Sequence, residues 1–330
     1  MIILLIGGLS IYLSIGKQLD QVINAFMNAK LYWVIVMIIV MFGYYISDAF
    51  SLLFFGKAYK SDYSFKQAFV NSVSGTFFNG ITPFASGGQF AQVYIFNKQG
   101  IVPTNSSSIL LMCFICYQSI LVLFTGIVVI LKYNYFIHEQ SGVFGLAMLG
   151  FLINFTVILG LFVGAKSKKF QDFVTHRVLW LLSKVRIVKD YETTCIRIEQ
   201  YLSDFRDQLS FLQNNKPVLF KSCLFNAIKL FILYSMPFFT TKALNLNISW
   251  NQFFDFIGLC SFIYLINAFL PIPGSSGGSE GVYLLLFGFL GSVGTSSSMF
   301  LWRFISYYMG LIVGGIVFSL DKEINKSRLE

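Results

Sequence analysis

The chain has 330 residues, of which 56% are hydrophobic and only 12% are charged, and its formal net charge is +9. A soluble domain usually carries about 25% charged residues, so this composition excludes an ordinary soluble protein and indicates a polytopic membrane protein. The positive charge does not require nucleic acid, because cytoplasmic loops of membrane proteins are rich in Lys and Arg, and we expect no nucleic-acid partner.

The apolar segments predict an all-α fold. Six of them read as full transmembrane helices: 1–15, 32–55, 106–131, 143–164, 218–242 and 299–320. The first is short for a hydrocarbon core of about 30 Å. Two further apolar regions, 67–96 and 253–295, are interrupted by Pro and Gly. We therefore predict a single integral membrane domain over residues 1–330, with six full helices and two broken hairpins.

The two interruptions contain the same phrase. Residues 83–89 read PFASGGQ and residues 273–279 read PGSSGGS, so both have the form P-x-x-S-G-G. Pro and Gly destabilise helix interiors. Broken segments at corresponding positions of two halves, here 1–165 and 218–330, are typical of re-entrant hairpins in an inverted repeat. Two alternatives stay open: kinked helices, or full crossing by both parts of the second region.

Loop charges predict the orientation. The polar stretch 166–217 holds ten of the 24 Lys and Arg residues, so we place it in the cytoplasm, together with both termini, in a protein of the cytoplasmic membrane. The first hairpin then enters from the cytoplasm and the second from outside, and the two phrases meet near the midplane. Apolar residues at helical spacing over 191–212 predict an amphipathic helix that lies on the bundle or membrane surface, or docks a partner.

A helix break inside a bilayer must be buried in protein or line a wet cavity, because lipid cannot satisfy the freed backbone groups. Half-helix N-termini also favour anionic groups. We therefore predict substrate-binding residues around both breaks. They are Asn79, Thr82, Pro83, Ser86, Gly87, Gly88 and Gln89 in the first, and Pro273, Ser276, Gly277, Gly278 and Glu280 in the second.

Charged residues within apolar spans add further candidates. A charge at membrane depth is costly and usually faces a partner or a wet pathway. Arg303 could pair with Glu280 or bind an anionic headgroup, and Asp48 and Lys229 could pair with each other. The alternative is that both are purely structural ion pairs.

Other features predict packing rather than chemistry. Gln118 and Asn226 suit interhelical hydrogen bonds, and Gly310-x-x-x-Gly314 suits close helix packing. The cysteines of Cys113-x-x-Cys116 lie in an apolar helix without a nearby histidine, so we read them as packing residues. No zinc-ligand spacing, nucleotide-binding loop or nucleophile motif occurs. We expect no catalytic residues, no metal and no cofactor.

The two broken segments resemble a known family. NGITPFASGGQFAQVYIF followed by KQGI, and LPIPGSSGGSEG followed by Arg303, look like the lysylphosphatidylglycerol synthase transmembrane, or flippase-like, family. That family includes the membrane half of the multiple peptide resistance factor. Its motifs match Asn79, Thr82, Pro83, Gly87 and Gly88, then Pro271, Pro273, Gly274, Gly277, Glu280 and Arg303. Gln89 departs from the pattern, because many relatives carry an acidic residue there.

The resemblance implies a lipid translocator for a phospholipid such as lysylphosphatidylglycerol, or for a glycolipid, with membrane lipids as partners. Glu280→Gln and Arg303→Ala should then slow translocation without unfolding the protein. One alternative is the membrane subunit of a phosphatidylglycerol lysyltransferase or other lipid-modifying system that contributes to cationic-peptide resistance, working with a separate lipid synthase or glycosyltransferase. Another is a secondary transporter of a small solute. We expect no lysyl transfer by this chain, which ends at Glu330 without an acyltransferase domain, and we leave a homo-oligomer open.

Overall fold

The computed structural model describes residues 19–131, 141–167, 169, 179–184, 190–267 and 272–325, and every regular element in these ranges is a helix. Four stretches are long and apolar enough to cross a membrane: α3 (Leu31–Tyr59), α6 (Pro103–Leu131), α12 (Lys216–Ala243) and the continuous stretch Ser292–Leu320. They match four of the six predicted spans. The predicted all-α polytopic membrane fold is confirmed.

The remaining two predicted spans are 1–15 and 143–164. The segment 1–15 lies outside the described residues. The segment 143–164 lies entirely within one helix, α8 (Ser141–Lys166). The last span begins at Ser292 rather than at residue 299, and it contains α15 (Ser292–Arg303), a π-helical segment η7 (Phe304–Tyr308) and α16 (Met309–Leu320).

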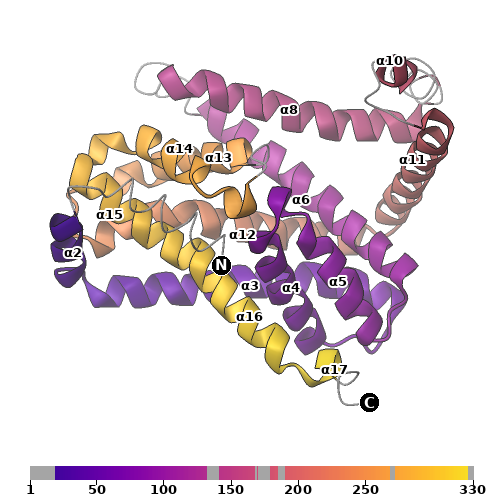
Figure 1. Cartoon of the computed structure of the whole chain (residues 1–330), viewed down its shortest axis with the longest axis horizontal. Coiled ribbons are helices and arrows are strands. Elements are labelled where there is room, and N and C mark those ends of the chain that lie inside the picture. The colour runs from indigo at the N-terminus through magenta and orange to yellow at the C-terminus, as the bar shows by residue number, and fades with distance from the viewer. Residues whose placement is uncertain are drawn as a thin grey trace.

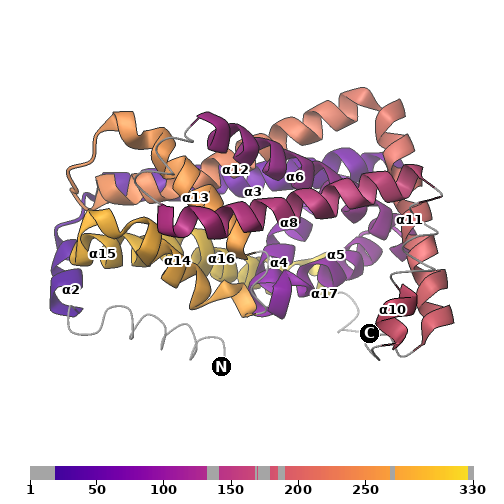
Figure 2. The same ribbon diagram turned by 90° about the horizontal axis from the view of Figure 1, so that it is seen from above.

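The antiparallel pair of α3 and α12 runs through the molecule (Figures 1 and 2). The start of α3 meets the end of α12, where the Lys30 amide donates to the Ala243 carbonyl at 2.8 Å. Helix α6 packs on both, and α8 lies outside α6 and α13. The apolar core fills the space between these helices with rings, such as the stacked pair Tyr283 and Trp302, whose centroids are 4.9 Å apart.

The first broken region is a helical hairpin. It consists of α4 (Phe65–Ile81), the 3-10 turn η2 (Pro83–Ala85) and α5 (Gly87–Lys98), and its two helices pack side by side. Ser64 starts α4 with a capping box, because its hydroxyl accepts from the Gln67 amide while the Gln67 side chain accepts from the Ser64 amide. The Gln99 side chain closes the open end by donating to the Gln67 carbonyl at 2.9 Å.

The second broken region is also a hairpin, built from α13 (Phe253–Asn267), η5 (Pro273–Ser275) and α14 (Gly278–Leu286). Its open end closes through the rings of Phe256 and Phe287, whose centroids are 5.1 Å apart. The start of α13 and the end of α14 therefore lie at the same end of the bundle. The predicted range 253–295 is too long, because η6 (Gly288–Leu290) separates the hairpin from the last span.

The two hairpins come from opposite ends of the bundle and their turns touch (Figure 1). The open end of the first lies beside α17 (Lys322–Asn325), where Nε2 of the Gln67 side chain donates to Oε2 of Glu323 at 3.1 Å. The open end of the second lies beside η4 (Trp250–Gln252), whose Trp250 ring is 6.1 Å from Trp33 at the start of α3. The two hairpins therefore point toward each other, and their entry from opposite sides of a membrane stays a prediction.

The polar stretch 166–217 contains two described helices, α10 (Leu179–Lys184) and α11 (Tyr191–Asn214), at the end of the molecule that also holds α17 (Figure 1). The helix predicted over 191–212 is confirmed. Leu209 and Leu212 of α11 are buried against the bundle. A short helix at the opposite end, α2 (Leu19–Met27), contacts α15.

Candidate functional site

The two P-x-x-S-G-G phrases begin with the same 3-10 turn. In both, the second and third residues have left-handed backbone angles: φ is 53° at Phe84 and 51° at Ala85, and 59° at Gly274 and 51° at Ser275. In both, the amide of the fourth residue donates to the proline carbonyl at 3.2 Å. A left-handed residue other than glycine costs roughly 1–2 kcal/mol, and such strain tends to gather at functional sites. The two turns then diverge, because ψ is −26° at Ser86 but 135° at Ser276, and the second helix starts one residue later in the phrase.

Side chains from the preceding helix cap the first turn. The Gly87 amide donates to the Thr82 hydroxyl at 2.8 Å, and the Gly88 amide donates to Oδ1 of Asn79 at 3.0 Å. A Cβ atom on either glycine would overlap the capping side chain. The first two amides of α5 are thus satisfied within the chain, and the glycines are needed so that the caps can approach.

A buried ion pair holds the second turn. Nε of Arg303 donates to Oε1 of Glu280 at 2.8 Å, and another guanidinium nitrogen donates to the Gly274 carbonyl at 2.9 Å. The second carboxylate oxygen of Glu280 accepts from the Gly277 amide at 2.8 Å. Glu280 is 1% exposed and Arg303 is 5% exposed. Of the two expectations for Arg303, the structure shows the pairing with Glu280.

Tyr307 connects the two turns. It lies in the π-helical segment of the last span, and its hydroxyl donates to the Gly80 carbonyl at the end of α4 at 2.9 Å. Its ring lies 4.4 Å from the Arg303 guanidinium, and it occupies the space that a Cβ on Gly274 would need. Sequence reasoning missed Tyr307, which is one of 17 tyrosines and part of an apolar run.

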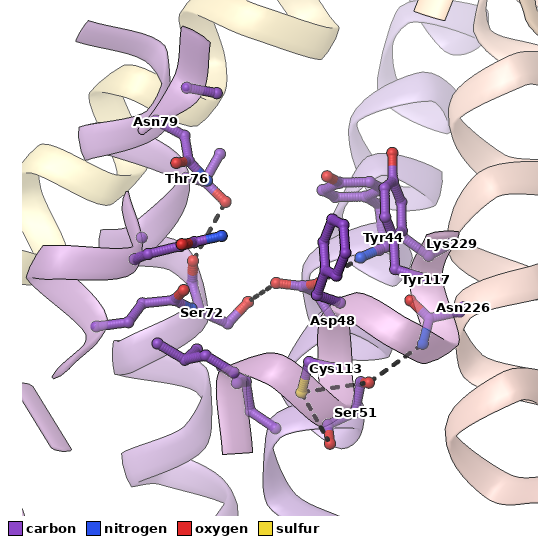
Figure 3. Close-up of a pocket in the computed structure, with 17 residues that line it drawn as sticks. Tyr44, Asp48, Ser51, Ser72, Thr76, Asn79, Cys113, Tyr117, Asn226 and Lys229 are labelled. Atoms are coloured by element: carbon purple, nitrogen blue, oxygen red, sulfur yellow. Dashed lines mark hydrogen bonds and ion pairs between the residues drawn. The ribbon is translucent and has the colours of Figure 1, made fainter. Parts of the chain in front are cut away.

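A cavity of about 330 Å³ opens beside the first turn (Figure 3). It is bounded by α3, α4, α5, α6 and α12. Four of the predicted site residues line it, namely Asn79, Gln89, Asp48 and Lys229. Glu280 and Arg303 are not among the lining residues.

The predicted pair of Asp48 and Lys229 is present in this cavity. The Lys229 ammonium donates to Oδ1 of Asp48 at 2.6 Å, and the Ser72 hydroxyl donates to Oδ2 at 2.5 Å (Figure 3). The ammonium also lies 4.6 Å from the Tyr117 ring centroid and 5.9 Å from that of Tyr44, which are cation–π distances. The Lys229 side chain is 10% exposed and the Asp48 side chain 23%. Among the described residues, no other charged side chain lines the cavity.

Further polar side chains of α3 and α12 form hydrogen bonds close to Asp48 and Lys229. The Asn226 amide donates to the Ser51 hydroxyl at 3.2 Å, and the hydroxyls of Ser51 and Ser222 are 3.0 Å apart. Gln118 donates to Asn154 at 2.7 Å between α6 and α8. The interhelical hydrogen bonds expected for Gln118 and Asn226 are therefore present, and they tie α12 to α3 and α6 to α8.

The remaining predicted residues belong to the turns. Ser86 is exposed and donates to the Pro83 carbonyl at 2.9 Å. Ser276 is buried, and Pro273 and Gly278 bound the second turn. Pro271 lies outside the described residues. A substrate-binding role for all these residues stays a prediction.

Several cavity residues were missed although the sequence holds a signal for them. Residues three or four apart share one helix face. The polar lining side chains follow this spacing on three helices: Tyr44, Asp48 and Ser51 on α3, Ser72, Thr76 and Asn79 on α4, and Asn226 and Lys229 on α12. Three polar stripes in otherwise apolar helices would have predicted a shared polar site.

The described residues contain no group of three His, Cys, Asp or Glu side chains placed to hold a metal ion. The arrangement is instead that of a polar cavity with a charge-neutral ion pair.

A comparison with protein-family models gives a match. A family model described as the lysylphosphatidylglycerol synthase TM region matches residues 1–314. No curated protein matches the sequence. The match covers nearly all of the chain and includes both broken hairpins and the cavity. The protein therefore belongs to the family of the lysylphosphatidylglycerol synthase transmembrane region.

Proposed function

We propose that the protein moves a membrane lipid across the cytoplasmic membrane, and that the polar headgroup passes through the cavity while the acyl chains stay in the surrounding lipid. The observation that carries this proposal is a polar cavity with an ion pair part-way along helices long enough to span a membrane. Asp48 lies within Leu31–Tyr59 and Lys229 near the middle of Lys216–Ala243. Ionisable groups at such depth usually mark a substrate or ion pathway.

The two hairpins support the same proposal. Each hairpin comes from a different end of the bundle, and the turn of one hairpin touches the turn of the other. Re-entrant hairpins of this kind surround the substrate site in many transporters, because their irregular backbone is tolerated only next to protein or a wet cavity. In this proposal both hairpins are re-entrant. The first hairpin supplies side chains that line the cavity, and the second hairpin braces the first.

The orientation follows from the distribution of lysines. The end that holds the open side of the first hairpin also carries basic residues: Lys57, Lys60, Lys66, Lys98, Lys216 and Lys322. Positive charge gathers on the cytoplasmic side of membrane proteins. We therefore assign this end to the cytoplasm, so that the first hairpin and the cavity beside it face the leaflet in which lipids are made.

A lipid-movement assay on the purified protein tests the proposal. Proteoliposomes with fluorescent lipid analogues should show faster transbilayer movement than protein-free liposomes. Lys229→Met should reduce the rate at least about tenfold, because it leaves the Asp48 carboxylate without its partner in the headgroup path. Lys221→Met is the matched control, since Lys221 is an exposed lysine of the same helix that lies outside the cavity. Wild-type protein that moves no lipid faster than empty liposomes would refute the proposal.

A second candidate, the membrane subunit of a lipid-modifying system, is favoured by the family description, which names a synthase. Helix α11 would be the docking element, because Ile196 on it is 66% exposed. Co-purification of a lipid synthase or glycosyltransferase that is lost on Ile196→Glu would support this candidate. Retention of the partner by that variant would exclude α11 as its site.

A further inference from the structure

The cavity carries no net charge. Among the described lining residues the one carboxylate, Asp48, accepts from both Lys229 and Ser72, and the one ammonium, Lys229, donates to Asp48 and lies over the Tyr117 ring. A headgroup with a net charge would lose its hydration there without meeting an unpaired counter-charge, and burial of an unpaired charge is costly. An uncharged headgroup meets no such penalty.

The cavity also holds polar groups with unused hydrogen-bonding capacity. Within the described part of the chain, the structure shows no hydrogen-bond partner for the side chains of Gln89, Gln92 and Tyr117. Asn79 uses its Oδ1 for the Gly88 cap, which leaves its amide nitrogen free to donate. A carboxamide offers two donors and an acceptor, and a phenol both donates and accepts. These groups fit a ligand that itself presents many donors and acceptors.

We propose that this cavity binds an uncharged, hydroxyl-rich group, such as the hexose or glycerol unit at the head of a glycolipid, and that Gln89 sets this preference. The inference rests on the proposed function and narrows its substrate. Hydroxyls donate and accept, as the free amides do, and the volume of about 330 Å³ falls in the range of small-molecule pockets, about 300–1,000 Å³. Gln89 is exposed toward the cavity beside the first turn, so a headgroup meets it without displacing the caps.

Lipid retention by the purified protein tests this choice. Nanodiscs would contain equal amounts of monoglucosyl diacylglycerol, phosphatidylglycerol and lysylphosphatidylglycerol with matched acyl chains, and native mass spectrometry would count the lipids that stay bound. We expect the glucosyl lipid to be enriched about tenfold over both charged lipids, which corresponds to about 1.4 kcal/mol. Equal or stronger retention of either charged lipid would overturn the proposal.

Three variants assign the preference to Gln89. Gln89→Leu removes the amide and should lower the enrichment of the glucosyl lipid several-fold. Gln89→Glu adds a carboxylate and should shift retention toward lysylphosphatidylglycerol. Gln213→Leu is the matched control, because Gln213 is an exposed glutamine on α11 outside the cavity, and it should leave the enrichment unchanged. Thermal unfolding of each variant shows that it is folded, and enrichment that survives Gln89→Leu in folded protein overturns the role of Gln89.

Two further measurements separate this inference from the proposed function. Lipid movement in proteoliposomes without headgroup preference would refute the inference and leave translocation intact. Selective retention without movement would support the inference and refute translocation. Equilibrium dialysis with radiolabelled glucose distinguishes the source of the sugar: binding of free glucose as tight as that of the glucosyl lipid supports the same hydroxyl-rich chemistry with a soluble ligand.

Discussion

The hydroxyl of Tyr307 donates to the carbonyl of Gly80 at 2.9 Å, across 227 positions of sequence. Gly80 lies in the last turn of α4, where carbonyls have no partner within the helix. The same tyrosine packs on Arg303, which is bonded to the second turn. One side chain of the last span therefore braces both hairpins where they meet.

Tyr307→Phe should loosen this junction. The change removes one hydrogen bond and leaves a carbonyl unsatisfied, which costs about 1 kcal/mol. Hydrogen exchange should rise at the end of α4 and in both turns, and lipid movement should slow. The matched control is Tyr308→Phe, because the hydroxyl of Tyr308 is buried without a hydrogen-bond partner among the described residues, and its loss should change neither quantity. Equal effects of the two substitutions would show that the bond to Gly80 braces nothing.

The ion pair of Glu280 and Arg303 should behave as a structural unit. Because both are almost fully buried, Arg303→Met strands a carboxylate and should cost about 3–5 kcal/mol of stability. This replaces the sequence-based expectation that Arg303→Ala would slow translocation without unfolding. The double variant Glu280→Leu with Arg303→Met should regain much of the lost thermal stability in detergent.

A double-mutant cycle measures the coupling. Additive losses from the two single substitutions would contradict the pairing. Recovery of stability without recovery of lipid movement would show that the pair also contributes to function beyond holding the turn.

Gly88→Ala should destabilise the first turn. Its Cβ would overlap the Asn79 side chain that caps α5, and such overpacking costs about 1–3 kcal/mol. Gly281→Ala on α14 is the control, since no atom lies within 4 Å of its Cβ position and alanine favours the helix by up to about 1 kcal/mol. The temperature of thermal unfolding should therefore fall for Gly88→Ala and stay the same or rise for Gly281→Ala. A tolerated Gly88→Ala would mean that the Asn79 cap contributes little.

Local sequence rules predicted the parts of the fold that depend on local chemistry. The phrases around Pro83 and Pro273 contain helix breakers in apolar surroundings, so their turns could be placed without a structure. Asp48 and Lys229 stood out because charges are rare in apolar helices. The start of the last span was misplaced because Thr295 was assigned to the second broken region and Ser298 lay between the two predicted segments. In the structure they are buried, and they bond to the Phe287 carbonyl and the Tyr283 hydroxyl.

The cavity could not be placed from sequence alone, because it exists only where five helices meet. Ser72 reads as an ordinary small residue of α4 until α3 brings Asp48 to it. Tyr117 reads as a core aromatic until α12 places Lys229 against its ring. The sequence offered two candidate pairs, Glu280 with Arg303 and Asp48 with Lys229, and of these it is Asp48 with Lys229 that lines the cavity.

The central claim is that a headgroup crosses through this cavity, and filling the cavity tests it most directly. Gln92→Trp on α5 places a bulky ring among the lining residues, and Phe90→Trp places one on the same helix at a position that is 78% exposed. Transbilayer movement of a fluorescent lipid would be measured in proteoliposomes with equal amounts of each folded protein. The account predicts that Gln92→Trp falls to the protein-free rate while Phe90→Trp matches wild type. Wild-type movement by Gln92→Trp would contradict it, because the headgroup would then cross by another route.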